Sequence, residues 1–203
     1  MERKLAYKLL QQLKGKDLRK LADKFEITVF KDGKKNKGWA GHVIEHYLGL
    51  PINSAQSPNF GSWELKTVSL KRLRNGNLTI KETMAITMID PFNVKNTPFE
   101  KSHLLSKMKK ILILSRIWIG QNEPSSIVYG VHTFDIGNKR IYNQIKEDYE
   151  LVRNTIRDKG FEELSGRMGV FIQPRTKGPG HGSTSRAFYA RVPFLKKIIL
   201  LDD

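Results

Sequence analysis

Segments with helical periodicity alternate with short, apolar, strand-like runs along the 203 residues of this chain. The clearest helical pattern covers Ile141 to Lys159, where apolar side chains recur every three or four residues. The most apolar run, Ile111 to Trp118, has the length of a strand. This mixed order predicts an α/β or α+β fold, of which we expect α/β, in which helices flank a mixed central sheet as one domain over 1–203.

A hairpin signal lies between two further strand-like segments. Trp63 to Leu70 and Leu78 to Ile89 are separated by Arg74-Asn75-Gly76-Asn77, and Asn-Gly favours a tight β-turn. The other expected elements are helices over 5–13, 18–25, 39–48 and 102–110, strands over 127–134, 169–173 and 187–192, a basic loop over 31–37 and a Gly-rich loop over 174–185.

The charge of the chain is strongly positive. Thirty-six Lys and Arg against 20 Asp and Glu give a formal net charge of +16. The basic residues are concentrated before residue 38, and no acid occurs from Leu164 to Leu201. Such a field favours a polyanion, because neutralised phosphates release counterions. A basic surface kept for solubility and attraction to an anionic membrane are the alternatives.

The chain contains no cysteine, which excludes disulfides and thiolate zinc sites. The sequence after Met1 has no apolar signal core, and Ile111 to Ile119 is about half a membrane span. We expect a soluble, cytoplasmic protein without a structural zinc ion or membrane partner.

Glu64 and Lys66 are the first candidates for chemistry. Residues two apart on a strand point to the same face, so this carboxylate and ammonium would lie together. With another oxygen ligand they would suit metal-assisted hydrolysis of a phosphodiester, in which Mg²⁺ activates water and Lys66 orients it. An ordinary ion pair on a surface strand is the alternative.

Four segments in order resemble the MutH-like branch of the PD-(D/E)xK nucleases, which includes mismatch-repair nickases and type II restriction enzymes. They are 37–49, 63–67, 99–103 with Lys107, and 172–178 with 186–189. The resemblance implies a restriction-endonuclease-like fold. It also implies an N-terminal catalytic lobe over about 1–120 and a C-terminal DNA-reading lobe over about 121–203, with a DNA cleft between them.

The resemblance also implies a catalytic set. Glu45 and Glu64 would hold Mg²⁺, and Lys66 would activate water. The family has Asp before the Glu-x-Lys motif, where this chain has Asn59. An amide oxygen can bind a cation but adds no charge, so metal affinity should fall. Asn59 is then an engineered inactivation, a natural variant that relies on Glu45 and Glu64, or the mark of a catalytically dead DNA reader.

DNA-binding residues follow from the same segments. Arg175 suits bidentate contact with guanine in the major groove. His103 and Lys107 lie four apart on a helix face, as solvated positions or as phosphate contacts. Glu45 could equally be a boundary carboxylate on its helix. The full set expected at DNA is Lys37, His103, Lys107, Arg175, Lys177, His181, Arg186 and Tyr189.

The function that combines these features is a Mg²⁺-dependent endonuclease of the type II restriction kind, acting on double-stranded DNA as a monomer or homodimer, with no small-molecule cofactor. The resemblance implies GATC as the target. A mismatch-repair nicking enzyme and a catalytically inactive DNA-binding module are the alternatives. An RNA-binding protein is disfavoured because no aromatic stacking motif is present.

Overall fold

The computed structural model describes residues 1–50, 61–178 and 184–199. In chain order the elements are α1 (Arg3–Gln11), α2 (Leu18–Lys24), β1 (Phe30–Lys31), β2 (Lys34–Lys35), α3 (Trp39–Tyr47), β3 (Glu64–Arg72), β4 (Leu78–Ile80), β5 (Met84–Met88), α4 (Pro91–Asn96), the 3₁₀ helix η1 (Phe99–Lys101), α5 (His103–Met108), β6 (Lys110–Ile117), β7 (Val128–Asp135), α6 (Lys139–Asp158), β8 (Ile172–Thr176), β9 (Arg186–Ala190) and α7 (Val192–Ile199).

The central sheet has the strand order β4-β3-β6-β7. β3 runs parallel to β6, and the other two pairings are antiparallel, so the predicted mixed sheet is confirmed. The buried residues of β6 from Ile111 to Arg116 follow from its near-continuous apolar sequence, which suits a strand covered on both faces. The parallel register places Glu64 beside Ile111 and Lys66 beside Ile113.

The predicted hairpin is confirmed only in part. β3 does pair with β4, but the segment expected as one strand over 78–89 is divided, and its second half forms β5. β5 joins a separate antiparallel sheet of order β5-β9-β8, with a register shift between Ala85 and Thr87. The expected basic loop over 31–37 contains the short β1–β2 hairpin, where Asp32 and Gly33 have positive φ, as a tight turn requires.

Two hydrophobic clusters cover the two faces of the central sheet. One joins α1, α2 and α3 to Leu65, Leu112 and Leu114. The other joins Ile111 and Ile113 on the opposite face to the second sheet and to α5, α6 and α7. Alternate residues of β6 thus enter different cores. The clusters follow the sheet faces, and the division into lobes near residue 120 stays a prediction.

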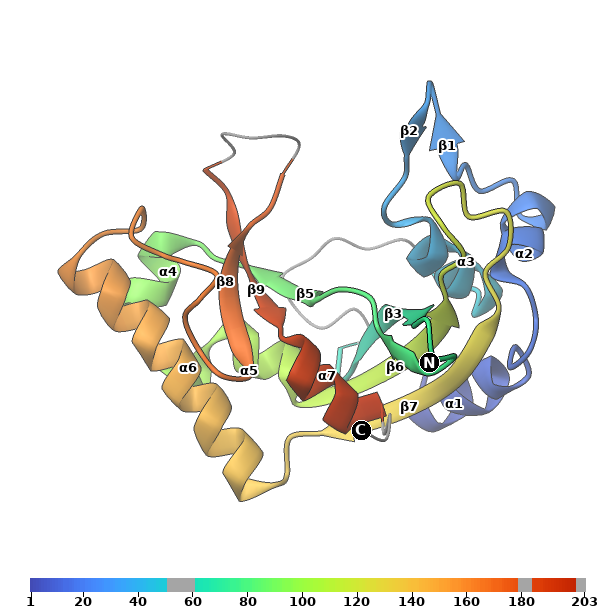
Figure 1. Cartoon of the computed structure of the whole chain (residues 1–203). Coiled ribbons are helices and arrows are strands. Elements are labelled where there is room, and N and C mark those ends of the chain that lie inside the picture. Colours follow the sequence, from blue (N-terminus) through green and yellow to red (C-terminus); the bar gives the residue numbers. More distant parts are fainter. Residues whose placement is uncertain (51–60, 179–183, 200–203) are drawn as a thin grey trace.

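Figure 1 shows the resulting arrangement, in which two arms extend from the same side of the central sheet. One arm carries α2, α3 and the β1–β2 hairpin, and the other carries β8 and β9. Among the described residues, no helix is both long and apolar enough to span a membrane.

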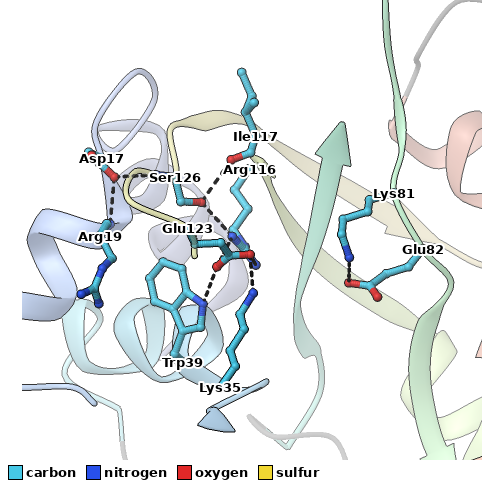
Figure 2. A network of polar contacts seen from close by, with 10 residues as sticks. All are labelled: Asp17, Arg19, Lys35, Trp39, Lys81, Glu82, Arg116, Ile117, Glu123 and Ser126. Carbon is cyan, nitrogen blue, oxygen red and sulfur yellow. Dashed lines mark hydrogen bonds and ion pairs between the residues drawn. The ribbon is translucent and has the colours of Figure 1, made fainter. Parts of the chain in front are cut away.

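A buried carboxylate fastens the first arm. Glu123 lies in the connection between β6 and β7, is fully buried, and has a φ of 39°. It accepts a hydrogen bond of 2.8 Å from the Trp39 indole and pairs with Lys35 at 2.5 Å and with Arg116 at 3.3 Å (Figure 2). Ser126 completes the group by accepting from Arg116 at 2.8 Å. The loop, the hairpin, α3 and β6 are thereby joined.

Candidate functional site

Glu64 and Lys66 lie together at the start of β3, on the face predicted from their spacing. The Lys66 Nζ is 2.7 Å from Glu64 Oε1. Glu64 is fully buried, whereas Lys66 keeps about a fifth of its side chain exposed. A surface ion pair, the alternative interpretation, would leave both partners in water. The burial of Glu64 instead indicates a built site, because an ionised carboxylate leaves water only where other groups compensate it.

A second lysine reaches the same carboxylate from another element. Lys107 lies on α5, is buried, and donates from Nζ to Glu64 Oε1 at 3.2 Å. Burial lowers the pKa of Lys107, and the positive charge of Lys66 lowers it further, while Glu64 opposes the shift. Lys107 is therefore not a solvated position on a helix surface, which was one of its two interpretations.

Glu45 brings a second carboxylate from α3. Trp39, Val43 and Ile44 are buried and seat this helix against the sheet, so Glu45 faces the first residues of β3. Burial raises the pKa of Glu45; the Lys66 charge opposes this, and the Glu64 charge adds to it. The two carboxylates thus share one electrostatic environment, which a boundary residue on an isolated helix would not do.

Glu45 and Lys66 line a cleft of about 630 Å³, and Glu64 and Lys107 lie behind its wall. Its walls come from α3, β3, the segment before β5 and the end of β8, so residues far apart in the sequence meet there. The lining includes Lys37, Gly38, Glu45, Lys66, Ser69, Glu82, Thr83, Arg116, Thr176, Lys177, Gly178 and Tyr189. Desolvation lowers the pKa of Lys177, as do the charges of Lys66 and Lys107. Lys177 thus extends the basic surface next to the paired carboxylates.

Of the residues expected at DNA, the structure brings Lys37, Lys177 and Tyr189 to the cleft and Lys107 to the carboxylate behind it. Arg175 lies one residue before that lining, with its guanidinium 5.8 Å from the Tyr189 ring.

The other expected residues lie elsewhere. Arg186 donates to the Glu162 carbonyl at 3.0 Å and lies over the Phe161 ring, away from the cleft lining. His103 borders a separate small cavity beside Thr87 and Asp90. Asn59 and His181 lie outside the described residues.

Glu82, Thr83 and Arg116 are polar lining residues that were not singled out from the sequence. Glu82 and Thr83 follow a short strand, and no local pattern marks them. Arg116 interrupts the apolar run of β6, and that interruption was the signal that could have identified it.

The donor set of the described residues suits a hard divalent cation. Glu45 and Glu64 supply carboxylate oxygens beside an open cleft, and Mg²⁺ typically binds one or two carboxylates together with waters and substrate phosphates. No cluster of three or more acidic or histidine side chains occurs within 1–50, 61–178 and 184–199. Glu45 and Glu64 are the carboxylates that the described residues offer to such a cation.

The chain is similar in sequence to curated DNA repair and restriction proteins. The chain is 28% identical over 168 residues to the type II restriction enzyme Sau3AI of Staphylococcus aureus, a match that covers 78% of this chain and 33% of that enzyme. It is 24% identical to the DNA mismatch repair protein MutH of Vibrio parahaemolyticus, over 92% of this chain and 88% of the relative. The chain thus spans about a third of the restriction enzyme and most of the repair protein.

Among solved structures, a complex of the restriction endonuclease MvaI with its cognate DNA aligns with 98% of this chain and 97% of its own, at 13% identity and a TM-score of 0.40. The model of the family described as DNA mismatch repair enzyme MutH matches residues 48–154, more than half of the chain. This match covers β3 and α5, the elements that carry Glu64 and Lys107. The chain belongs to the MutH family, and so to the MutH-like nucleases.

Proposed function

We propose that this chain is a metal-dependent, site-specific endonuclease that hydrolyses double-stranded DNA, of the type II restriction kind. The observation that carries the proposal is the buried Glu64 between Lys66 and Lys107, directly behind a cleft that Lys66 and Glu45 line. Family membership supports the reaction class, and the net charge of +16 supports a phosphodiester polyanion as substrate.

Glu64 and Glu45 are the residues that would hold Mg²⁺. When bound, the cation supplies positive charge next to the scissile phosphate and lowers the pKa of a water ligand. Asn59 would be a third, neutral ligand. Because an amide adds no charge, a natural Asn59 would leave the two glutamates to supply the negative charge that binds the cation.

The lysines would act on the substrate side. Lys66 pairs with Glu64, is partly exposed and lines the cleft. It would orient the attacking water and transfer its proton. Lys107 is buried behind it and would hold Glu64 in position. Lys37 and Lys177, from opposite walls of the cleft, would contact phosphates of the duplex.

Sequence would be read from the arm that carries β8 and β9. Arg175 and Tyr189 are the candidates there, because both lie beside the cleft and Arg175 can donate twice to a guanine edge. His181, Arg186 and His103 would contribute further DNA contacts, and GATC is the proposed target. An intracellular, cytoplasmic location and a monomeric or dimeric state belong to the same proposal.

The alternatives share this site. Relatives named MutH align over most of their length with this chain, which supports a mismatch-repair nicking enzyme as the second candidate. Asn59 supports the third, a DNA-binding module without catalytic activity.

A plasmid assay separates the three. The chain, Asn59→Asp and Glu64→Ala are each incubated with supercoiled plasmid and Mg²⁺, with a chelator as the metal control. We expect the Asp form to give linear fragments and the Glu64→Ala form to give none. Open-circular product alone would favour nicking. Intact plasmid with the Asp form, across many sequences, would sink the nuclease proposal, and tight binding without cutting would favour the DNA-binding module.

A further inference from the structure

Arg175 does not extend freely from its strand. On β8, Gln173 and Arg175 point to the same face, and Gln173 lies opposite Tyr189 of the middle strand β9. On its other side Tyr189 lies opposite Ala85 of β5, and Thr83 comes one residue before that strand begins. The Arg175 side chain therefore crosses the middle strand to reach the start of β5.

Two contacts hold the Arg175 guanidinium along that path. Its Nη1 donates to the Thr83 Oγ1 at 2.8 Å, a bond between residues far apart in the sequence. Its planar group lies over the Tyr189 ring, 5.8 Å from the ring centroid. Burial raises the pKa of Tyr189, so the ring remains a neutral phenol at physiological pH.

This arrangement restricts an otherwise mobile side chain. Arginine is one of the residues that lose the most rotamer freedom when they are fixed, and Arg175 is largely exposed. Bidentate recognition of guanine requires both donors of the planar fork to point in one direction. A guanidinium carries five N–H donors, so the bond to Thr83 leaves the fork capable of such a contact. Preorganisation of this kind removes part of the ordering cost of binding.

We propose that Thr83 is a positioning residue for base recognition, because it fixes the direction in which Arg175 presents its guanidinium to the cleft. The proposal rests on the proposed function, in which the cleft binds duplex DNA. Thr83 itself lines the cleft wall, so the bond is formed where the duplex would lie.

The test measures base preference and needs no cleavage. A library of short duplexes with randomised central base pairs is bound to each variant, and the bound fraction is sequenced. Wild-type protein should prefer guanine at one position or more, and Arg175→Ala should lose about 10-fold to 100-fold of that preference. Thr83→Val keeps the shape but removes the hydroxyl, and should lose about 5-fold. Thr83→Ser should restore it.

Thr133→Val is the matched control, because Thr133 is exposed on β7 and does not line the cleft. Total affinity for a non-specific duplex and the melting temperature are measured in parallel. An unchanged guanine preference in Thr83→Val would overturn the inference, and so would an equal loss of affinity for all sequences. If wild-type protein showed no base preference, or Arg175→Ala left it intact, the proposed reading role of Arg175 would itself fail.

Discussion

Two glutamates of this protein are equally buried and have opposite surroundings. Glu64 and Glu123 are both fully buried, and each lies between two cations. Burial alone would raise the pKa of Glu123. The hydrogen bond from Lys35 and the charge of Arg116 more than offset burial, so the pKa of Glu123 is lowered. Around Glu64 a second carboxylate, Glu45, has a raised pKa and Lys107 a lowered one.

This difference distinguishes a structural ion-pair group from a candidate active site. At Glu123 both cations favour the ionised carboxylate, which stabilises one conformation. At Glu64 two carboxylates and two lysines are crowded beside an open cleft, and the neutral forms of Glu45 and Lys107 gain stability. Perturbed titration in a cleft is typical of functional sites. Burial alone would not have distinguished the two residues.

The largest expected effect is on catalysis at Glu64. Glu64→Gln in the Asn59→Asp background should slow plasmid cleavage by about 100-fold to 1000-fold, because the charged side chain proposed as a metal ligand is lost. Its melting temperature should fall less than that of Glu123→Gln, because Lys66 can turn toward solvent and burial already lowers the pKa of Lys107, which favours its neutral form. Retained cleavage together with a strongly lowered melting temperature would show that Glu64 has a structural role like that of Glu123.

The next effect is on stability at Glu123. Glu123→Gln removes one partner of a buried ion pair and should lower the free energy of unfolding by about 3 kcal/mol in urea denaturation. Cleavage well below the melting temperature should stay within a few-fold of the parent. The matched control is Glu82→Gln, an exposed glutamate of the cleft, for which about 0.5 kcal/mol or less is expected.

Acid should remove the stabilisation that ionised Glu123 gives to the wild-type protein. The folded pKa of Glu123 lies below the ordinary glutamate value of 4.5, so its stabilisation is fully present above about that pH and is lost as the pH falls through the folded pKa. The stability difference between wild type and Glu123→Gln should therefore be constant from neutral pH to about 4.5 and shrink below it. A constant difference down to pH 3 would contradict the assignment.

The smallest expected effect is on stability at Trp39, the uncharged hydrogen-bond donor to Glu123. Trp39→Phe keeps an aromatic ring against α3 but removes the indole N–H that donates to Glu123 at 2.8 Å. The loss should be about 1 kcal/mol of unfolding free energy, less than for the charge itself. An effect as large as that of Glu123→Gln would show that packing of Trp39, and not the carboxylate, fastens this arm.

Local patterns predicted most elements and few of the pairings. The helix expected over 39–48 is α3, and the one over 141–159 is α6. The parallel pairing of β3 with β6 joins distant segments, and nothing in either strand specifies its partner. The break within 78–89 could not be predicted from local sequence, because both halves have strand composition. The break depends on which sheet each half joins.

The candidate site was predictable where chemistry and spacing coincide. Glu64 and Lys66 share a face because strands alternate, and the family resemblance drew attention to Glu45. Lys107 looked like a surface residue, since a lysine on a short helix usually is, and only the packing of α5 against the sheet buries it. Glu123 was missed because it occurs in a loop rich in polar residues, where a fully buried carboxylate has no local signal.

The parallel pairing of β3 with β6 also sets an order of events during synthesis. Lys66 lies beside Ile113, and Lys107 precedes β6, so Glu64 acquires its partner from α5 only after that later segment has left the ribosome. Long-range pairings of this kind form late because a long loop must close first. A nascent or truncated chain that ends before α5 therefore carries the Glu-x-Lys motif without the second lysine that contacts Glu64.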